Sequence, residues 1–216
     1  MAYNYSGTLN PERGLIWRIV HRDNIPWILD NGLHCGSSTV KSGQWVSIGN
    51  SELIGKRANH PVPVPPYGCL NDYVPFYFTP FSPMLLNILS GRGVPQRSNK
   101  EIVILVSSVE RIQHLTLDYA YTDMHAYYQW ATFYKDPAQL SQIDWSILQT
   151  RDFSRNMNDP AKFERYQAEF LVHQHCPVQA LQGMVCYDEV VQQQLNGWLQ
   201  QRQLLMDVRV RPGWYF

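Results

Sequence analysis

The sequence has little charge, and what it has is balanced. Lys and Arg total 18 residues, Asp and Glu also total 18, and charged residues make up 17% of the chain, against about 25% in an average soluble protein. This balance excludes the strongly basic footprint that nucleic-acid and membrane binders usually carry. The hydrophobic content of 44% excludes a disordered chain.

Long apolar runs are also missing. The longest aliphatic run, residues 102–106, is far too short to cross a bilayer. The first ten residues contain neither the basic nor the apolar region of a signal peptide. We therefore expect a cytoplasmic protein with no membrane partner.

Cysteine is scarce and scattered. The absence of any Cys-x-x-Cys pair argues against a disulfide framework or a zinc ribbon, and predicts reduced core residues. The four cysteines are Cys35, Cys69, Cys176 and Cys186. A metal site could be drawn from His173, His175 and Cys176 with Cys186, but a strand end before a turn at Pro177 explains the same stretch. No metal is predicted.

Several common catalytic motifs are absent. The sequence has no Gly-x-Ser-x-Gly, no Walker loop, no His-Glu-x-x-His and no Gly-x-Gly-x-x-Gly. The run His21-Arg22-Asp23-Asn24 is similar to a kinase catalytic loop, but Ile28 stands where that loop needs Asn. Any catalytic site must therefore be assembled from scattered residues.

The predicted strands, with helices inserted between them, indicate an α+β protein. Its 216 residues suit a single domain, residues 1–216, with mostly antiparallel central sheets and inserted helices. The 101–107 run is continuously aliphatic and predicts a buried, central strand. Strands are expected at residues 15–21, 73–79, 101–107, 169–172, 183–187 and 204–210.

Polar residues mark where the helices should begin. Asp23, Asn50, Ser82 and Asp188 each precede a helical pattern and can accept a hydrogen bond from its first turn. In the helix after Asn50, helical spacing places Arg57 on the same side as Leu53.

Residues 119–159 follow no clean period and are rich in aromatic residues, which predicts a long substrate-recognition loop or an insertion. Exposed rings could stack on unpaired bases, and arginines could contact phosphates. The alternative is that the rings pack the segment onto the domain. The candidate rings are Tyr121, Tyr127, Tyr128 and Trp130, and the candidate arginines are Arg92, Arg97, Arg151 and Arg155.

Short stretches that match a known protein family occur along most of the chain. The most specific is Asp72-Tyr-Val-Pro-Phe-Tyr-Phe-x-Pro-x-Ser-Pro-Met84, and the others are Trp17-Arg-Ile-Val-His-Arg-Asp-Asn24, Arg57, Thr122-Asp-Met-His125 and Gln167-Ala-Glu169. In these residues the chain resembles the DarT family, the DNA ADP-ribosyltransferase toxins of DarT–DarG toxin–antitoxin systems. The resemblance implies a single-domain ADP-ribosyltransferase-like fold, NAD as consumed co-substrate, thymine in single-stranded DNA as acceptor, and a macrodomain antitoxin (DarG-like) as partner.

The resemblance also implies roles for three catalytic residues. Glu169 is the carboxylate that holds the ribose 2′-OH and faces the positive charge that grows as the nicotinamide bond breaks. Without the resemblance, the sequence predicts only an exposed glutamate at the start of a strand. Arg57 matches a catalytic arginine. Its guanidinium is too weak a base to accept a proton, so we expect it to lower the pKa of the thymine N3 electrostatically. His125 matches a histidine that orients this arginine.

The remaining implied contacts concern NAD and the acceptor base. Arg18, Val20, Asn24, Arg57 and Tyr77 match NAD-binding positions, and Met84 matches a position near the incoming base. Arg18 departs from transferases of the wider fold, which often have histidine there. Read without the resemblance, Tyr77 and Met84 suit a protein core equally well.

Two other functions stay open from the sequence. The same fold could modify RNA or protein, or the chain could be a catalytically silent nucleic-acid-binding module. A panel of acceptors with labelled NAD separates the first alternative, and DNA binding without nicotinamide release identifies the second.

Overall fold

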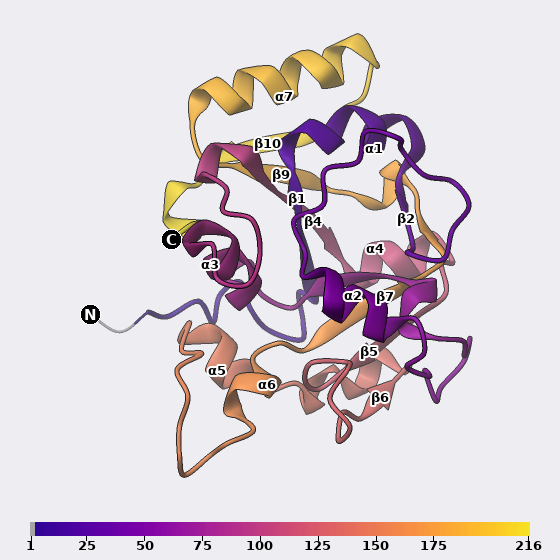
Figure 1. The fold of residues 1–216 in the computed structure, drawn as a ribbon, viewed down its shortest axis with the longest axis vertical. Helices are drawn as coiled ribbons and strands as arrows, with labels where there is room; N and C mark the ends of the chain where they lie inside the picture. The colour runs from indigo at the N-terminus through magenta and orange to yellow at the C-terminus, as the bar shows by residue number, and fades with distance from the viewer. Residues whose placement is uncertain (1–2) are drawn as a thin grey trace.

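A computed structural model describes residues 3–216, and its centre is an eight-stranded sheet (Figure 1). The strand order is β10-β9-β4-β1-β3-β7-β5-β6. These strands are β1 (Leu15–His21), β3 (Tyr73–Tyr77), β4 (Ile102–Ser108), β5 (Tyr119–Thr122), β6 (Phe133–Tyr134), β7 (Glu169–His173), β9 (Gly183–Cys186) and β10 (Asp207–Val210). A separate two-stranded sheet contains β2 (Leu33–His34) and β8 (His175–Cys176).

The α+β prediction is confirmed. Neighbouring strands in the described residues pair antiparallel, apart from β9 and β10, which run parallel. The continuous aliphatic strand β4 lies inside the sheet between β1 and β9, as its pattern predicts.

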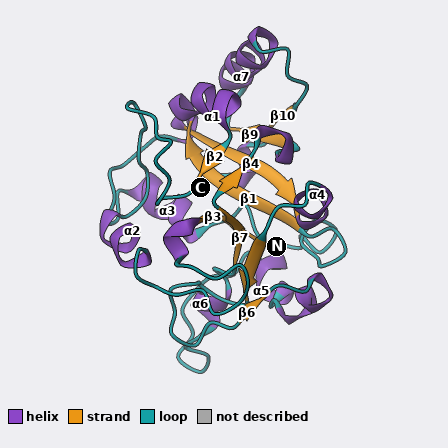
Figure 2. Cartoon of the chain, turned by 90° about the vertical axis from the view of Figure 1, so that its right-hand side faces the viewer, coloured by secondary structure: helices purple, strands orange, loops and turns teal. Residues whose placement is uncertain are grey.

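Helices and loops surround this sheet (Figure 2). The helix α7 covers one end of the molecule beside β9 and β10, whereas α5 and α6 lie at the opposite end with β5 and β6 (Figure 1). Among the helices of residues 3–216, none has the length and apolar character of a membrane span. The helices are α1 (Ile25–Asn31), α2 (Ser51–Arg57), α3 (Pro83–Ser90), α4 (Val109–His114), α5 (Trp145–Gln149), α6 (Lys162–Arg165) and α7 (Glu189–Gln201).

Three of the four predicted helix caps form. Asn50 accepts from the Leu53 N–H (2.9 Å), Ser82 from the Met84 N–H (3.1 Å) and Asp188 from the Val191 N–H (3.0 Å). The Asp23 cap is wrong, because a 3₁₀ turn (Arg22–Asn24) precedes α1. His21 Nδ1 caps that turn by accepting from the Asp23 N–H (3.2 Å).

The 119–159 segment is more ordered than its sequence pattern suggests. It begins with β5, which is buried along its whole length and pairs with β7 inside the main sheet. Tyr121 in this strand is fully buried between Phe78 and Phe170. Large aromatic side chains thus fill the core here, because each buries far more apolar area than an aliphatic residue.

The sheet is split between β1 and β3. The strand β1 pairs with β4 at seven positions, but with β3 only at Trp17↔Tyr77. Pro75 accounts for part of this split. Its carbonyl faces β1, where it accepts from Arg18 Nη1 (2.6 Å), and its missing N–H lies on the same side of the strand, so it cannot extend a ladder toward β1.

Candidate active site

A cavity of about 390 Å³ opens where the sheet splits. Its volume lies within the range of small-molecule sites. Its walls come from β1, α1, α2, β3, α3 and the segment between β2 and α2. Its lining includes Arg18, Val20, Asn24, Trp27, His34, Trp45, Leu53, Arg57, Tyr77, Met84, His125 and Glu169.

Glu169 is buried at this cavity, with 2% of its surface exposed. It is the first residue of β7 and lies opposite Tyr77, at the point where β1 and β3 still touch. The expectation of an exposed glutamate is therefore wrong, since contacts with Arg57, Thr122 and Ala126 enclose it. Its N–H donates to Thr122 Oγ1 (3.2 Å), which fixes the start of the strand.

The Glu169 carboxylate is nevertheless ionised. It accepts from Arg57 Nη1 (3.0 and 3.2 Å) and from the Ala126 N–H (3.0 Å). Burial raises the pKa of Glu169, but Arg57, His125 and the Ala126 N–H outweigh it and hold that pKa below its ordinary value. The site therefore offers a negative charge that water does not screen.

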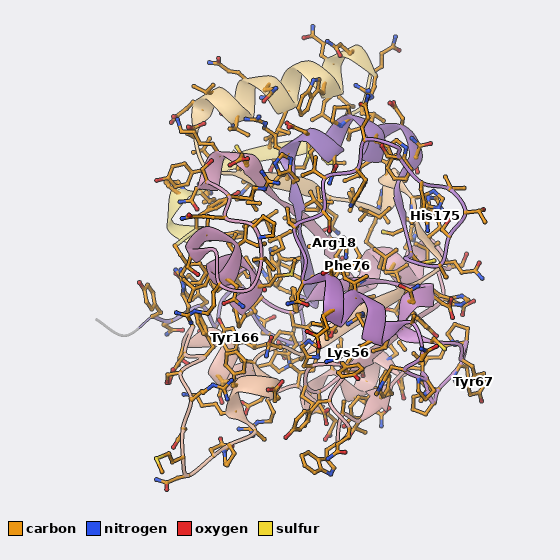
Figure 3. All side chains as sticks on the ribbon, in the orientation of Figure 1. Arg18, Lys56, Tyr67, Phe76, Tyr166 and His175 are labelled. Carbon is orange, nitrogen blue, oxygen red and sulfur yellow. The ribbon has the colours of Figure 1, made fainter. Side chains whose placement is uncertain are left out.

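Arg57 reaches Glu169 from the last turn of α2. Its neighbour Lys56 lies on the outer face of this helix, paired with Glu52 (2.6 Å) (Figure 3). Arg57 and Leu53 both line the cavity, which confirms their predicted shared side. Arg57 Nη2 is buried and has no hydrogen-bond partner within residues 3–216. The Nη2 amino group of this cation is thus ready to donate to a ligand.

His125 lies on the other side of the same carboxylate. Its Nδ1 is 3.8 Å from Glu169 Oε1 and accepts from the Tyr127 N–H (3.2 Å). The resemblance implied that His125 orients Arg57. In the described residues, His125 and Arg57 instead meet through the carboxylate that both approach.

Arg18 and Tyr77 add polar groups to the cavity. Figure 3 shows Arg18 near the centre of the molecule. Burial lowers the pKa of Arg18 to about 10, so it remains charged at neutral pH, and its buried Nε has no partner in the described part of the chain. Burial raises the pKa of Tyr77 to about 12. Its hydroxyl stays protonated and contacts Met84 Sδ (3.8 Å).

Asn24 supports the cavity indirectly. Its side-chain amide donates to the Val46 carbonyl and accepts from the Val46 N–H, both at 2.8 Å. The amide is therefore engaged by the chain between β2 and α2, and it positions that segment. Val20 lines the cavity from β1 and is buried.

Sequence reasoning missed one wall of the cavity. The Trp27 ring lies 5.7 Å from His34 and 5.6 Å from Trp45, all between ring centroids. Residues 33–49 have no regular hydrophobic period. The aromatic residues Trp27 and Trp45, which follow the matched Trp17–Asn24 stretch, were the only sequence signal for this wall.

A second groove, of about 600 Å³, adjoins the cavity at His125, which lines both. Two of the predicted DNA-contacting rings, Tyr127 and Tyr128, line it. Trp130 is 65% exposed and its ring lies 4.9 Å from that of Tyr128. The lining residues are His60, His125, Tyr127, Tyr128, Gln129, Phe163, Glu164 and Gln167.

Tyr121 does not belong to this surface. It is 0% exposed, and its hydroxyl donates to the Asp136 carbonyl (2.6 Å). The prediction that it serves as a stacking platform is wrong, because a ring inside the sheet cannot reach a base.

The four candidate arginines differ in availability. Arg92 is exposed after α3, and Arg155 is exposed with its guanidinium 4.9 Å from the Phe163 ring. Arg97 pairs with Glu101 (3.6 Å). Arg151 donates to the carbonyls of residues 213 and 215 and packs on three rings, one of them Phe216, so it holds the C-terminal residues in place.

All four cysteines are free; three are buried and Cys69 is half-buried. Within residues 3–216, His, Cys, Asp and Glu side chains form no group of three that could hold a metal ion.

The split sheet and the buried, ionised glutamate beside an arginine define a site suited to cleaving a glycosidic bond next to a developing positive charge. Comparisons with known proteins agree with this class. The family model described as "ssDNA thymidine ADP-ribosyltransferase, DarT" matches residues 17–216. A DNA ADP-ribosyl transferase of Escherichia coli O127:H6 (strain E2348/69 / EPEC) is 62% identical over 217 residues, covering 100% of both chains.

Solved structures agree as well. Thermus sp. 2.9 DarT in complex with ADP-ribosylated ssDNA superposes with a TM-score of 0.88 at 31% identity, covering 100% of both chains. The same protein in complex with NAD+ has a TM-score of 0.83 at 33% identity, covering 95% of this chain and 99% of that one. This chain belongs to the DarT family of single-stranded DNA thymidine ADP-ribosyltransferases.

Proposed function

We propose that this protein transfers the ADP-ribosyl group of NAD+ to thymine in single-stranded DNA. The observation that carries the proposal is the Glu169 carboxylate, buried and ionised between Arg57 and His125 at the cavity of a DarT-family chain. The NAD+ and modified-DNA complexes of the Thermus relative support both substrates.

Glu169 acts on the ribose of NAD+. Breaking the bond between ribose C1′ and nicotinamide leaves positive charge on the ribose, and a nearby carboxylate stabilises that charge while it accepts a hydrogen bond from the 2′-OH. The carboxylate is held in place by Arg57 and the Ala126 N–H, so little reorganisation is needed when the charge appears.

The two arginines of the cavity supply cationic donors. Arg18 Nε and Arg57 Nη2 are both buried without partners in the described residues, and both suit a phosphate or carbonyl oxygen. We assign Arg18 to the NAD+ pyrophosphate. Arg57 stabilises the negative charge that develops on thymine when N3 loses its proton.

The DNA strand lies in the second groove. Tyr127 and Tyr128 line it and Trp130 projects beside it, so stacking supplies much of the affinity. Arg92 and Arg155 are exposed and contact phosphates. In this proposal residues 119–159 serve substrate recognition through the part that follows β5.

As a DarT-family protein, the chain acts as a toxin in the cytoplasm, and a macrodomain antitoxin counteracts it. Expression in a bacterial host should arrest growth, and co-expression of a macrodomain that removes ADP-ribose from DNA should restore it. Growth arrest by a Glu169→Ala variant would show that toxicity has another cause.

The direct test uses oligonucleotides that differ at one base. Protein and NAD+ are incubated with strands containing a single thymine or a cytosine in its place, and the mass of each strand is measured. We expect the mass of one ADP-ribosyl group on the thymine strand alone. The activity should disappear in Glu169→Ala and persist in Glu12→Ala, which removes an exposed carboxylate. Labelling of RNA or protein instead of thymine would identify a different acceptor.

A further inference from the structure

The proposed transfer requires a group that removes a proton from thymine. In thymidine, N1 carries the deoxyribose, so N3 is the ring nitrogen that attacks ribose C1′, and N3 carries a proton. Glu169 already holds the ribose 2′-OH in this proposal, and its neighbours keep its pKa below the ordinary value, so it is a weak base for this proton. Arg57 carries a guanidinium, which is a donor only and has no lone pair to offer.

His125 is not free to accept the proton either. Its Nδ1 lone pair receives the Tyr127 N–H, so in the neutral ring the proton resides on Nε2. Nδ1 is therefore occupied as an acceptor and Nε2 carries the proton. His125 can only donate a hydrogen bond to a ligand.

His60 is the histidine with a free lone pair at this place. It lines the second groove together with His125, three residues after Arg57. Neither of its ring nitrogens has a hydrogen-bond partner within residues 3–216, and its ring packs at a tilt against that of Tyr127, with 5.0 Å between the ring centroids. Its N–H donates to the Arg57 carbonyl (3.3 Å) and its carbonyl accepts from the Leu70 N–H (2.9 Å), which fixes the backbone at the groove.

The charges around His60 keep its ring neutral. Partial burial, Arg57 and His125 lower the pKa of His60 below its ordinary value, while Glu169 acts in the opposite direction. Glu164 and the hydroxyls of Tyr127 and Tyr128 are the other titratable groups that line the groove. At neutral pH the ring is thus unprotonated and able to accept a proton.

We propose that His60 is the general base that accepts the N3 proton of the target thymine. This role rests on the proposed function. As the C1′–nicotinamide bond breaks, its electron pair leaves with nicotinamide. The N3 lone pair forms the new bond to C1′, and the N3 proton moves to the His60 ring. The resulting imidazolium lies near Glu169 and returns its proton to water through the open groove.

The test compares His60→Gln with His114→Gln, which changes an exposed histidine on α4. General-base removal typically costs at least about 10²-fold in rate, so we expect kcat for oligonucleotide modification to fall by about that factor in His60→Gln alone. The Kd values for NAD+ and oligonucleotide should stay unchanged. In the wild type, kcat should decline as the pH falls through the pKa of His60, which lies below the ordinary histidine value of about 6.5, and this decline should be absent from His60→Gln.

A more acidic acceptor provides an internal check. Oligonucleotides carry either uracil or 5-fluorouracil at the target position, since fluorine makes N3 more acidic with little change in size. The ratio of 5-fluorouracil to uracil rates should be at least about tenfold higher in His60→Gln than in the wild type, because an acidic N3 depends less on a base. Imidazole added to His60→Ala should restore activity.

Three results overturn the role: wild-type kcat in His60→Gln, an unchanged ratio of the two acceptors, or a wild-type kcat that stays flat from pH 7.5 to pH 5. A wild-type protein that leaves every oligonucleotide unmodified contradicts the proposed function as well. Thymine modification by the wild type, with an unaltered His60→Gln variant, contradicts only the role of His60.

Discussion

Arg57 Nη1 lies 3.0 Å from Glu169 Oε2 and 3.2 Å from Oε1, so one nitrogen bridges both oxygens of a carboxylate 112 residues further along the chain. The pair joins the end of α2 to the start of β7 across the split in the sheet. Both groups are shielded, with 12% and 2% of their side chains exposed. The same contact therefore prepares the site and ties two distant segments together.

Removing Arg57 should destabilise the protein through its partner. In Arg57→Ala, Glu169 is left as a buried charge without its cation, which typically costs about 3–5 kcal/mol of unfolding free energy. Urea denaturation at pH 7.5 measures this loss. The double variant Arg57→Ala/Glu169→Gln should regain much of it, because no charge is then buried.

The pH dependence of that loss follows from the same pair. Without Arg57, burial raises the folded-state pKa of Glu169 above its ordinary value of 4.5. The folded variant then takes up a proton more readily than the unfolded chain, so the loss relative to the wild type is largest at pH 7.5 and shrinks toward pH 5. An equal loss at both values would mean that Glu169 stays solvated in the variant.

Substitutions at Trp130 and Tyr121 should have separate effects, one on oligonucleotide affinity and the other on the free energy of unfolding. Trp130→Ala removes an exposed ring, so oligonucleotide affinity should fall by about 1–3 kcal/mol, the value of one stacked base, with unchanged unfolding free energy. Tyr121→Phe removes the hydroxyl that bonds the Asp136 carbonyl and should cost about 1 kcal/mol of stability with unchanged affinity. Fluorescence anisotropy and urea denaturation measure the two quantities, and an effect of Tyr121→Phe on affinity alone would contradict the assignment.

Asn24 should act on NAD+ binding through Val46. Asn24→Ala removes both hydrogen bonds that hold the segment between β2 and α2 against the cavity. Loosening a wall of the site should raise the KM for NAD+ by about tenfold while kcat changes less, since each 1.4 kcal/mol of lost binding is tenfold. Steady-state kinetics with a saturating oligonucleotide measure this, with Asn196→Ala on the exposed face of α7 as control. A loss confined to kcat would place Asn24 in the chemistry instead.

Regular elements were predictable where local signals were strong. A few neighbouring residues are enough to predict these elements. The aliphatic run predicts β4, and a capping side chain marks the start of each of three helices, at Asn50, Ser82 and Asp188. The short strand β5 was not predictable, because four residues show no clear period and its pairing with β7 is made across the fold. Likewise, nothing near Asp23 reveals that the preceding His21 takes over the capping role.

The site was accessible from sequence chiefly through its resemblance to a family. Glu169, Arg57 and His125 lie far apart in the chain, and only the split sheet brings them together. The burial of Glu169 could not be inferred, because it depends on Tyr77 opposite and on both flanking segments. His60 left no signal beyond its closeness to Arg57, since its free ring is visible only once the groove is formed.

The pair His34 and His175 should make stability sensitive to mild acid. Their rings lie 4.3 Å apart, and the Nε2 atoms are 3.2 and 2.8 Å from the same acceptor, the Asn31 carbonyl. Burial, followed by the nearby His175, lowers the pKa of His34 below 6.5. The unfolded chain then binds more protons than the folded one, so stability present above pH 6.5 is lost as pH falls through the folded-state pKa.

A His175→Asn variant should show a smaller decrease in Tm between pH 7.5 and pH 5 than the wild type, because one source of repulsion is gone. Calorimetry at several pH values measures this difference, with exposed His114→Asn as control. Parallel Tm curves for the wild type and His175→Asn would show that the pair carries no strain when protonated.

The balanced charge of the chain should appear in the salt dependence of DNA binding. Several arginines are paired internally, as in Arg165 with Asp144 and Asp159, which leaves Arg92 and Arg155 as the proposed phosphate contacts. Each phosphate neutralised on a single strand contributes a slope of about −0.7 in log K against log salt. Two contacts predict a slope of about −1.4, and Arg92→Ala or Arg155→Ala should each reduce it by about 0.7, whereas Arg13→Ala should not. A slope steeper than about −3 would mean that many more cations reach the strand, so that charge rather than stacking holds it.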